Sequence, residues 1–201
     1  MKITYTTCLL DVGNVSKSHE WVTTFSQIQQ VILNMGYPVD PGPFIIYGQS
    51  GKKRGEGNGV VPIKEILMSK LPNTCCREIP LPLNSGGKLG KLDVVATVGN
   101  YRFALEWETG NVSSSHRAVN KMLLGLYDGA IQAGILIVPV KNFAQYLTDR
   151  IGNYEELAQY FPLWRQQSIP SGILYILGIE HDSVSMDVPR FPKGTDGRAI
   201  I

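Results

Sequence analysis

Residues 92–108 read LDVVATVGNYRFALEWE. Two runs rich in β-branched and aromatic residues, 92–98 and 101–108, flank the pair Gly99-Asn100, which suits a two-residue hairpin turn. The stretch therefore predicts an antiparallel hairpin, and three acidic residues lie on its strands.

The turn also sets which residues face each other across the hairpin. If Val98 pairs with Tyr101, counting outward places Asp93 opposite Glu106. Glu106 and Glu108 share one face of their strand, because side chains alternate along it. Directly opposed residues have Cβ atoms about 4.5–5.5 Å apart, and like charges there are destabilising unless something compensates. Mg²⁺ is a suitable compensation, since it accepts carboxylate, water and phosphate oxygens. The alternative is that the acids are solvated charges on an outer face.

The rest of the chain alternates helical and strand patterns. The predicted elements are helices 20–35 and 62–70, strands 92–98 and 101–108, a helix that Ser113–Ser115 cap and that runs to about Ala133, a strand over 135–140, helices 142–150 and 154–165, a strand over 172–179, and a Pro/Gly-rich tail over 189–201. This order predicts an α/β fold with a mixed central sheet flanked by helices.

Composition fits a single domain over residues 1–201, with a catalytic core at about 60–140. The 201 residues are 43% hydrophobic and 18% charged, which argues against a disordered or fibrous chain. The formal charge of +2 is small, so contact with nucleic acid would need a local basic patch.

Membrane and disulfide classes are not favoured. The longest apolar run, 133–140, is far shorter than a membrane-spanning helix, and residues 1–12 lack the pattern of a signal peptide. Three cysteines, Cys8, Cys75 and Cys76, have no metal-binding spacing and are expected to be reduced thiols. We expect a cytoplasmic protein without membrane contact.

Several familiar motifs fail on spacing. Gly51-Lys52 and Gly87-Lys88 lack the upstream glycine and the following Ser or Thr of a phosphate loop. No serine has the setting of a hydrolase elbow, and the histidines lack the spacing of a zinc protease. Residues 52–54, KKR, are interpreted as a mobile basic loop that DNA could order.

One family pattern does match. Asp93, twelve intervening residues and then Glu106-Trp107-Glu108, on two strands followed by a helix and a buried strand, resembles the core of the PD-(D/E)XK nucleases. Glu in place of the usual final Lys resembles the branch of type II restriction endonucleases that includes BamHI, BglII and BstYI. Residues 60–70 and 133–140 are similar to the helix and strand that flank that core, although Leu92 replaces the proline of the motif.

This resemblance implies a role for each acidic residue. Asp93, Glu106 and the backbone carbonyl of Trp107 would hold Mg²⁺, for which Mn²⁺ could substitute, and Glu108 would orient or deprotonate the attacking water. Glu65 is placed like a helix residue that assists the metal in some members, or it is an ordinary exposed glutamate.

The resemblance also implies where double-stranded DNA is bound. Lys88 and Lys91 suit phosphate contacts. Base reading is expected from the segment after the catalytic strand, namely Asn111, Ser113, Ser114, Ser115, His116 and Arg117. Lys141 and the pair Asp149-Arg150 follow the buried strand, where related enzymes place another reading loop, although a solvated face is the alternative.

The implied function is that of a homodimeric type II restriction endonuclease that cuts both strands of a short palindrome, because a two-fold DNA site is matched most simply by a symmetric dimer. Two alternatives remain open: a nuclease of repair or recombination that acts on a structured substrate, and a non-catalytic DNA-binding domain.

Overall fold

A six-stranded mixed sheet organises the protein. The computed structural model describes residues 1–53, 55–72, 75–148 and 150–193. In spatial order the strands are β1 (Lys2–Val12), β7 (Gly172–Glu180), β6 (Ala133–Pro139), β5 (Tyr101–Trp107), β4 (Lys88–Val98) and β3 (Cys76–Pro82). The pairs β5/β6 and β6/β7 are parallel, and the other three are antiparallel. The predicted mixed sheet is confirmed.

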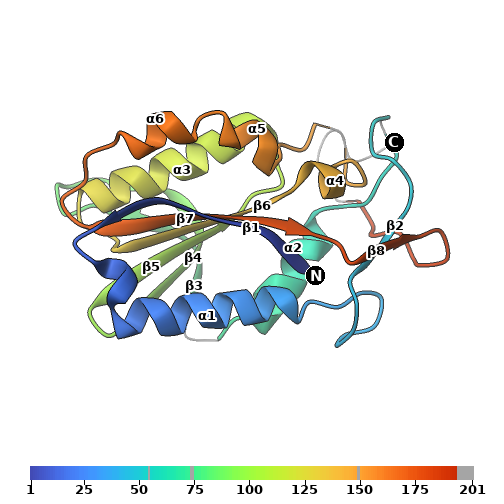
Figure 1. Ribbon diagram of the computed structural model, residues 1–201, viewed down its shortest axis with the longest axis horizontal. Helices are drawn as coiled ribbons and strands as arrows, with labels where there is room; N and C mark the ends of the chain where they lie inside the picture. Colours follow the sequence, from blue (N-terminus) through green and yellow to red (C-terminus); the bar gives the residue numbers. More distant parts are fainter. Residues whose placement is uncertain (54, 73–74, 149, 194–201) are drawn as a thin grey trace.

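Helices cover both faces of this sheet (Figure 1). One face carries α1 (His19–Leu33) and α2 (Val61–Lys70), and the other carries α3 (Val112–Tyr127), α5 (Tyr154–Ala158) and α6 (Phe161–Arg165). The remaining elements are η1 (Val15–Lys17), α4 (Lys141–Ala144) and a small parallel pair, β2 (Ile45–Tyr47) with β8 (Ser183–Ser185). Within the described ranges, every helix is too short or too polar to cross a bilayer.

The core is densest around β6. All seven residues of this strand, AGILIVP, are buried, because parallel neighbours flank it and helices cover both of its faces. Val119, Met122 and Leu126 of α3 are fully buried against this layer. The apolar centre therefore fixes the position of β5, the strand paired with β6, and with it the position of the acidic residue that β5 carries.

The hairpin register predicted from the sequence is confirmed. The paired residues run from Val98↔Tyr101 back to Val94↔Leu105, and one further step in the same register leads to Asp93 and Glu106. Gly99 has a φ of 57°, the left-handed conformation that a tight two-residue turn requires of a residue without Cβ.

Two edge strands were not predicted. β1 lacks a regular alternation of buried and exposed residues, and β3 contains Pro80 and Pro82, which argue against a strand in sequence. Both prolines are tolerated because β3 lies at the edge of the sheet, where one row of backbone donors needs no partner.

Several predicted helix boundaries were wrong. The cap of α3 is Asn111, whose side chain accepts a hydrogen bond from the Ser114 N–H at 3.0 Å, and the helix ends at Tyr127 rather than near Ala133 because Gly129 turns the chain at φ 70°. The helix predicted over 154–165 is two short helices, since Pro162 starts a new one. The helix predicted over 142–150 contracts to α4, and α1 ends at Leu33 instead of Met35.

The segment that contains the basic loop is anchored on both sides of residues 52–53. Asn58 is fully buried, and its side-chain amide donates to the carbonyls of Tyr47 and Tyr146 at 2.9 and 2.8 Å. The Gly51 N–H donates to the Gln145 carbonyl at 2.8 Å. Lys52 and Lys53 lie between these anchors. Arg54, Asp149 and residues 194–201 lie outside the described residues.

We expect Leu136→Ala to lower the free energy of unfolding by about 2–5 kcal/mol, because Leu136 is fully buried in the central strand and its truncation leaves a cavity. Urea unfolding measures the change. Leu33→Ala, at an exposed position on α1, is the control and should change stability by less than about 0.5 kcal/mol. Equal losses in the two variants would contradict this view of the core.

Candidate active site

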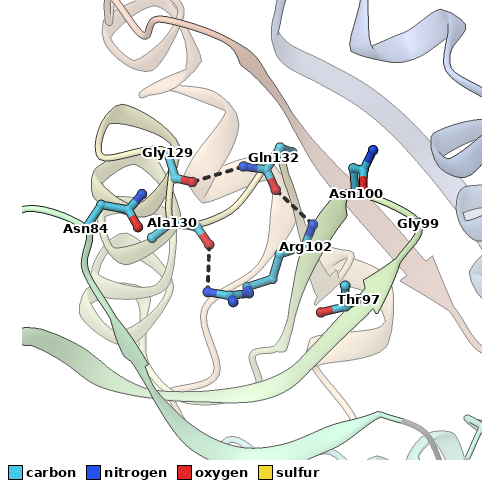
Figure 2. Close-up of a pocket in the computed structure, with 8 residues that line it drawn as sticks. All are labelled: Asn84, Thr97, Gly99, Asn100, Arg102, Gly129, Ala130 and Gln132. Atoms are coloured by element: carbon cyan, nitrogen blue, oxygen red, sulfur yellow. Dashed lines mark hydrogen bonds between the residues drawn. The ribbon is translucent and has the colours of Figure 1, made fainter.

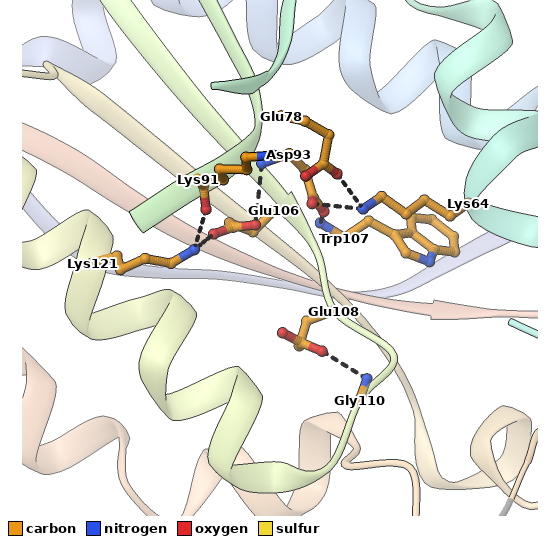
Figure 3. A network of polar contacts seen from close by, with 9 residues as sticks. All are labelled: Lys64, Glu78, Lys91, Asp93, Glu106, Trp107, Glu108, Gly110 and Lys121. Atoms are coloured by element: carbon orange, nitrogen blue, oxygen red, sulfur yellow. Dashed lines mark hydrogen bonds and ion pairs between the residues drawn. The ribbon is translucent and has the colours of Figure 1, made fainter. Parts of the chain in front are cut away.

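Acidic side chains gather where β4, β5 and the start of α3 meet (Figure 3). Asp93 is contributed by β4 and Glu106 by β5, while Glu108 lies in the short link between β5 and α3. The apolar strands on either side hold these three backbone segments in place. The structure therefore brings together the acids that the hairpin register predicted.

Asp93 is tied to both neighbouring elements. One carboxylate oxygen accepts a hydrogen bond from the Trp107 N–H at 2.8 Å, and the other accepts from Lys64 Nζ at 2.6 Å. Lys64 comes from α2 and also contacts Glu78 Oε1 at 3.2 Å. Burial lowers the pKa of the Lys64 amine, whereas its contacts with the carboxylates of Asp93 and Glu78 raise it. The net result is a pKa above the ordinary value. Asp93 is thus oriented before any ligand binds.

Glu106 is the most deeply buried acid of the site, with 6% of its surface exposed. Its Oε2 accepts a hydrogen bond from the Asp93 N–H at 3.3 Å, and its Oε1 forms an ion pair with Lys121 of α3. Burial raises the pKa of the Glu106 carboxyl, and the charge of Asp93 adds to this rise, while Lys121 opposes it. An ionised Glu106 therefore needs a neighbouring cation.

Glu108 is held by the turn that follows its strand. Its Oε1 accepts a hydrogen bond from the Gly110 N–H at 2.7 Å, and its own N–H donates to the Ile137 carbonyl at 2.9 Å. Burial raises the pKa of the Glu108 carboxyl, the Gly110 N–H opposes the rise, and the charge of Asp93 adds to it. Among the hydrogen bonds of the described residues, the second carboxylate oxygen of Glu108 accepts none, and the pKa of the carboxyl is raised.

Glu78 is an acid of the site that sequence reasoning missed. It lies on β3 between the pairs Arg77↔Val94 and Ile79↔Leu92, so the register places it across from Asp93. Its φ of 52° is unusual for a residue with a Cβ, and such strain is concentrated at functional sites. Because prolines hid β3 in the sequence, no register could be counted for it.

The donor set suits a hard divalent cation. Glu78, Asp93 and Glu106 form a row of carboxylates across three neighbouring strands, and the buried Glu106 Oε1 accepts no hydrogen bond of good geometry. In the described part of the chain no three His, Cys, Asp or Glu side chains already surround one common point, because Lys64 and Lys121 hold two of the acids. The residue types fit Mg²⁺, and the site is charge-compensated by lysines.

Two residues expected at the site lie elsewhere. Ile63 and Leu67 of α2 face the core, and Glu65 is exposed on another side of this helix. Its neighbour Lys64 is the residue of α2 that contacts Asp93. The helical phase of Ile63 and Leu67 could have revealed this. Ser115 is fully buried in α3.

The other candidates for DNA contact occupy different surroundings. Lys88 and Lys91 are exposed on β4, and Asn111, Ser113, Ser114 and Arg117 lie in the first turns of α3. His116 packs edge-on against Tyr160 at 4.3 Å, toward α6. Lys141 lines a groove of about 310 Å³ together with Lys52 and Arg150. Two basic segments far apart in sequence thus meet in one groove.

A second polar pocket lies at the opposite end of the hairpin (Figure 2). It has a volume of about 270 Å³ and is lined by Arg102, Asn84, Gln132 and the turn at Gly99. Arg102 donates from its guanidinium to the Ala130 carbonyl at 3.3 Å, and Gln132 accepts from the Arg102 N–H at 2.8 Å. No carboxylate lines this pocket among the described residues, so the chemistry belongs at the acidic end.

Comparison with known proteins gives consistent results. The family described as restriction endonuclease BamHI matches residues 1–198. The type II restriction enzyme OkrAI of Oceanobacter kriegii is 44% identical over 176 residues, covering 87% of this chain and 88% of that protein. The type II restriction enzyme BamHI of Bacillus amyloliquefaciens is 41% identical over 148 residues, covering 70% and 67%.

A solved structure has a similar fold. The crystal structure of restriction endonuclease BglII complexed with a DNA 16-mer has a TM-score of 0.65 and 15% sequence identity, and the match covers 90% of this chain and 79% of that chain. The predicted restriction-endonuclease-like fold is confirmed.

The raised pKa of Glu108 predicts a pH-dependent loss of stability. An acid whose pKa is higher in the folded state destabilises the fold above its unfolded pKa of about 4.3, and the loss disappears in acid. In metal-free protein, Glu108→Gln should therefore be more stable than the wild type at neutral pH and equally stable toward pH 4, measured by urea unfolding with EDTA. Glu65→Gln is the exposed control and should follow the wild type. A wild type with a higher free energy of unfolding than Glu108→Gln at neutral pH would contradict this prediction.

Proposed function

This chain belongs to the restriction endonuclease BamHI family, and from that premise we propose that it is a type II restriction endonuclease that cuts both strands of a short palindromic DNA sequence. The observation that carries the proposal is the row of carboxylates from Glu78 through Asp93 to Glu106, with Glu108 beside it. Family membership disfavours the two alternatives, a structure-selective repair nuclease and a non-catalytic domain. We propose that residues 1–201 form one nuclease domain.

Asp93, Glu106 and the backbone carbonyl of Trp107 would hold Mg²⁺, with Glu78 as a further ligand, and Mn²⁺ could substitute because the donors are hard oxygens. The ion, when bound, supplies charge stabilisation and a more acidic water. The protein's own contribution is to fix the donors: the Trp107 N–H and Lys64 orient Asp93, and the Asp93 N–H orients Glu106.

Glu108 is the proposed general base. The Gly110 N–H fixes one of its oxygens, which leaves the other to accept a proton from the attacking water. A raised pKa makes a carboxylate a better proton acceptor near neutral pH. Glu108 therefore performs the work that a lysine performs in other branches of the superfamily.

Double-stranded DNA would approach along β4 and the start of α3. Lys88 and Lys91 are placed for phosphate contacts, and Asn111, Ser113, Ser114 and Arg117 are placed for base contacts in a groove. Asn111 can cap α3 and contact a base at the same time, because its Oδ1 accepts the Ser114 N–H while its side-chain NH₂ group can donate to a base. His116 is turned toward Tyr160, away from this surface, and Lys141 would contact DNA from the groove that it lines with Lys52 and Arg150.

A second copy of the chain is the proposed partner. The outer face of α3 and α6 exposes Leu124, Tyr127 and Leu163 at 46%, 64% and 57%, around a hollow of about 410 Å³. An apolar patch of this kind is typical of a protein interface. A two-fold dimer through it would present two active sites to the two strands of a palindrome. We also infer a cytoplasmic location, consistent with the three free cysteines.

Asp93→Asn, Glu106→Gln and Glu78→Gln should each lower the rate of plasmid cleavage by at least about 100-fold, because even outer partners of a metal site cost about 10- to 100-fold. Glu65→Gln should cleave at close to the wild-type rate, since Glu65 is exposed and points away. Cleavage should need Mg²⁺ or Mn²⁺ and stop in EDTA. A Glu65→Gln variant that loses more activity than Glu78→Gln would overturn this ligand set.

Phosphate and base contacts should separate in DNA-binding measurements made in Ca²⁺. Lys88→Ala or Lys91→Ala should weaken binding to every DNA about equally and reduce the salt dependence by about one phosphate contact. Asn111→Ala or Arg117→Ala should cost about 1–3 kcal/mol on the preferred site and little elsewhere. If these two variants leave the ratio of specific to non-specific affinity unchanged, the start of α3 does not read bases.

Leu124→Glu combined with Leu163→Glu should convert the dimer to monomers in analytical ultracentrifugation. The two introduced carboxylates would be buried in the proposed interface, near the same carboxylates of the second copy and without a cation. Leu33→Glu places the same charge on an exposed position of α1 and should leave the dimer intact. A dimer that survives the first pair of substitutions would place the interface on another surface.

A further inference from the structure

The Lys121 side chain reaches the active site from α3, and its ammonium group lies beside the Glu106 carboxylate. Its ammonium group forms an ion pair with Glu106 Oε1 and donates to the Lys91 carbonyl at 2.7 Å (Figure 3). The Lys121 side chain is 19% exposed and that of Glu106 is 7% exposed, so the pair is largely shielded from water. Such a pair is stronger than one on the surface.

Both oxygens of Glu106 lie against polar groups of the protein, although only Oε2 accepts a hydrogen bond of good geometry. Oε2 accepts from the Asp93 N–H, and Oε1 faces Lys121. A divalent ion that took Oε1 would meet the ammonium group at the same lone pairs, and two cations repel each other there. Lys64 pairs with two acids, Glu78 and Asp93, whose side chains are 58% and 13% exposed. Lys121 pairs with Glu106, which is more deeply buried, with 7% of its side chain exposed.

We propose that Lys121 is a built-in counter-cation of Glu106, which neutralises this buried acid in the metal-free enzyme and must leave Oε1 when a metal ion binds. This inference rests on the metal site of the proposed function. It assigns a cost to metal binding, because an existing ion pair must be broken. Asn111 and Arg117 lie on the same helix, so the placement of the DNA-contacting end of α3 is linked to the availability of Glu106.

Calorimetric titration of Ca²⁺ into DNA-free protein tests the sign of this effect. Lys121→Met should bind Ca²⁺ roughly tenfold or more tightly than the wild type, because a positive charge next to the ion is removed. Lys121→Arg keeps the charge and should resemble the wild type. Lys70→Met removes another lysine ion pair, with Asp40 at 2.6 Å on the surface, and is the matched control. Unchanged or weaker Ca²⁺ binding by Lys121→Met overturns the proposal.

Thermal melting supplies a second readout. In EDTA, Lys121→Met should melt below the wild type, since Glu106 is left buried without its cation, and saturating Ca²⁺ should narrow the difference. If the variant does not fold, the wild type can be tested by chemical acetylation, measured by mass spectrometry. Ca²⁺ should raise the acetylation rate of the Lys121 amine relative to that of Lys70. An unchanged ratio contradicts displacement.

The two proposals can fail separately. A wild type that binds Ca²⁺ through Asp93, with no gain in Lys121→Met, contradicts only the role of Lys121. A wild type and variants that all fail to bind Ca²⁺ or Mn²⁺ would remove the metal site itself.

Discussion

Repulsion between Asp93 and Glu106 is the constraint on which this active site depends. The two carboxylates face each other across paired strands, and Glu106 is almost fully buried, so the fold cannot hold both charges without cations. Lys64 and Lys121 supply those cations within the chain. Leaving a buried charge unpaired costs about 3–5 kcal/mol, a large share of the stability of one domain. The apolar layer around β6 offsets this local cost and keeps the acids in register.

Helix α3 joins three parts of the proposed activity. Its first turns carry Asn111 and Arg117, its inner side carries Lys121, and its outer side exposes Leu124 and Tyr127. The proposed DNA contact, the charge balance of Glu106 and the proposed contact with a second copy therefore depend on one helix. α3 packs on β6 through fully buried residues. A displacement of the helix would therefore move Lys121 and change its ion pair with Glu106.

The sequence was most informative where local rules act. Gly99-Asn100 predicted the turn, and the turn predicted the register that joins Asp93 to Glu106. It was least informative where tertiary context decides. Prolines hid the edge strand β3 and with it Glu78, which only pairing with β4 places beside Asp93. The partners Lys64 and Lys121 come from two helices on opposite faces of the sheet, and nothing in their sequence spacing to the acids indicates such contacts.

The central proposal is that Asp93, in the middle of β4, and Glu106, near the end of β5, hold the catalytic metal ion. Anomalous diffraction from crystals of the protein with Mn²⁺ and DNA tests it most directly. The account predicts a Mn²⁺ peak bonded to Asp93, Glu106 and the Trp107 carbonyl, with the Lys121 ammonium group moved away from Glu106 Oε1. A peak elsewhere, or a Lys121–Glu106 pair that persists beside the bound ion, would contradict it.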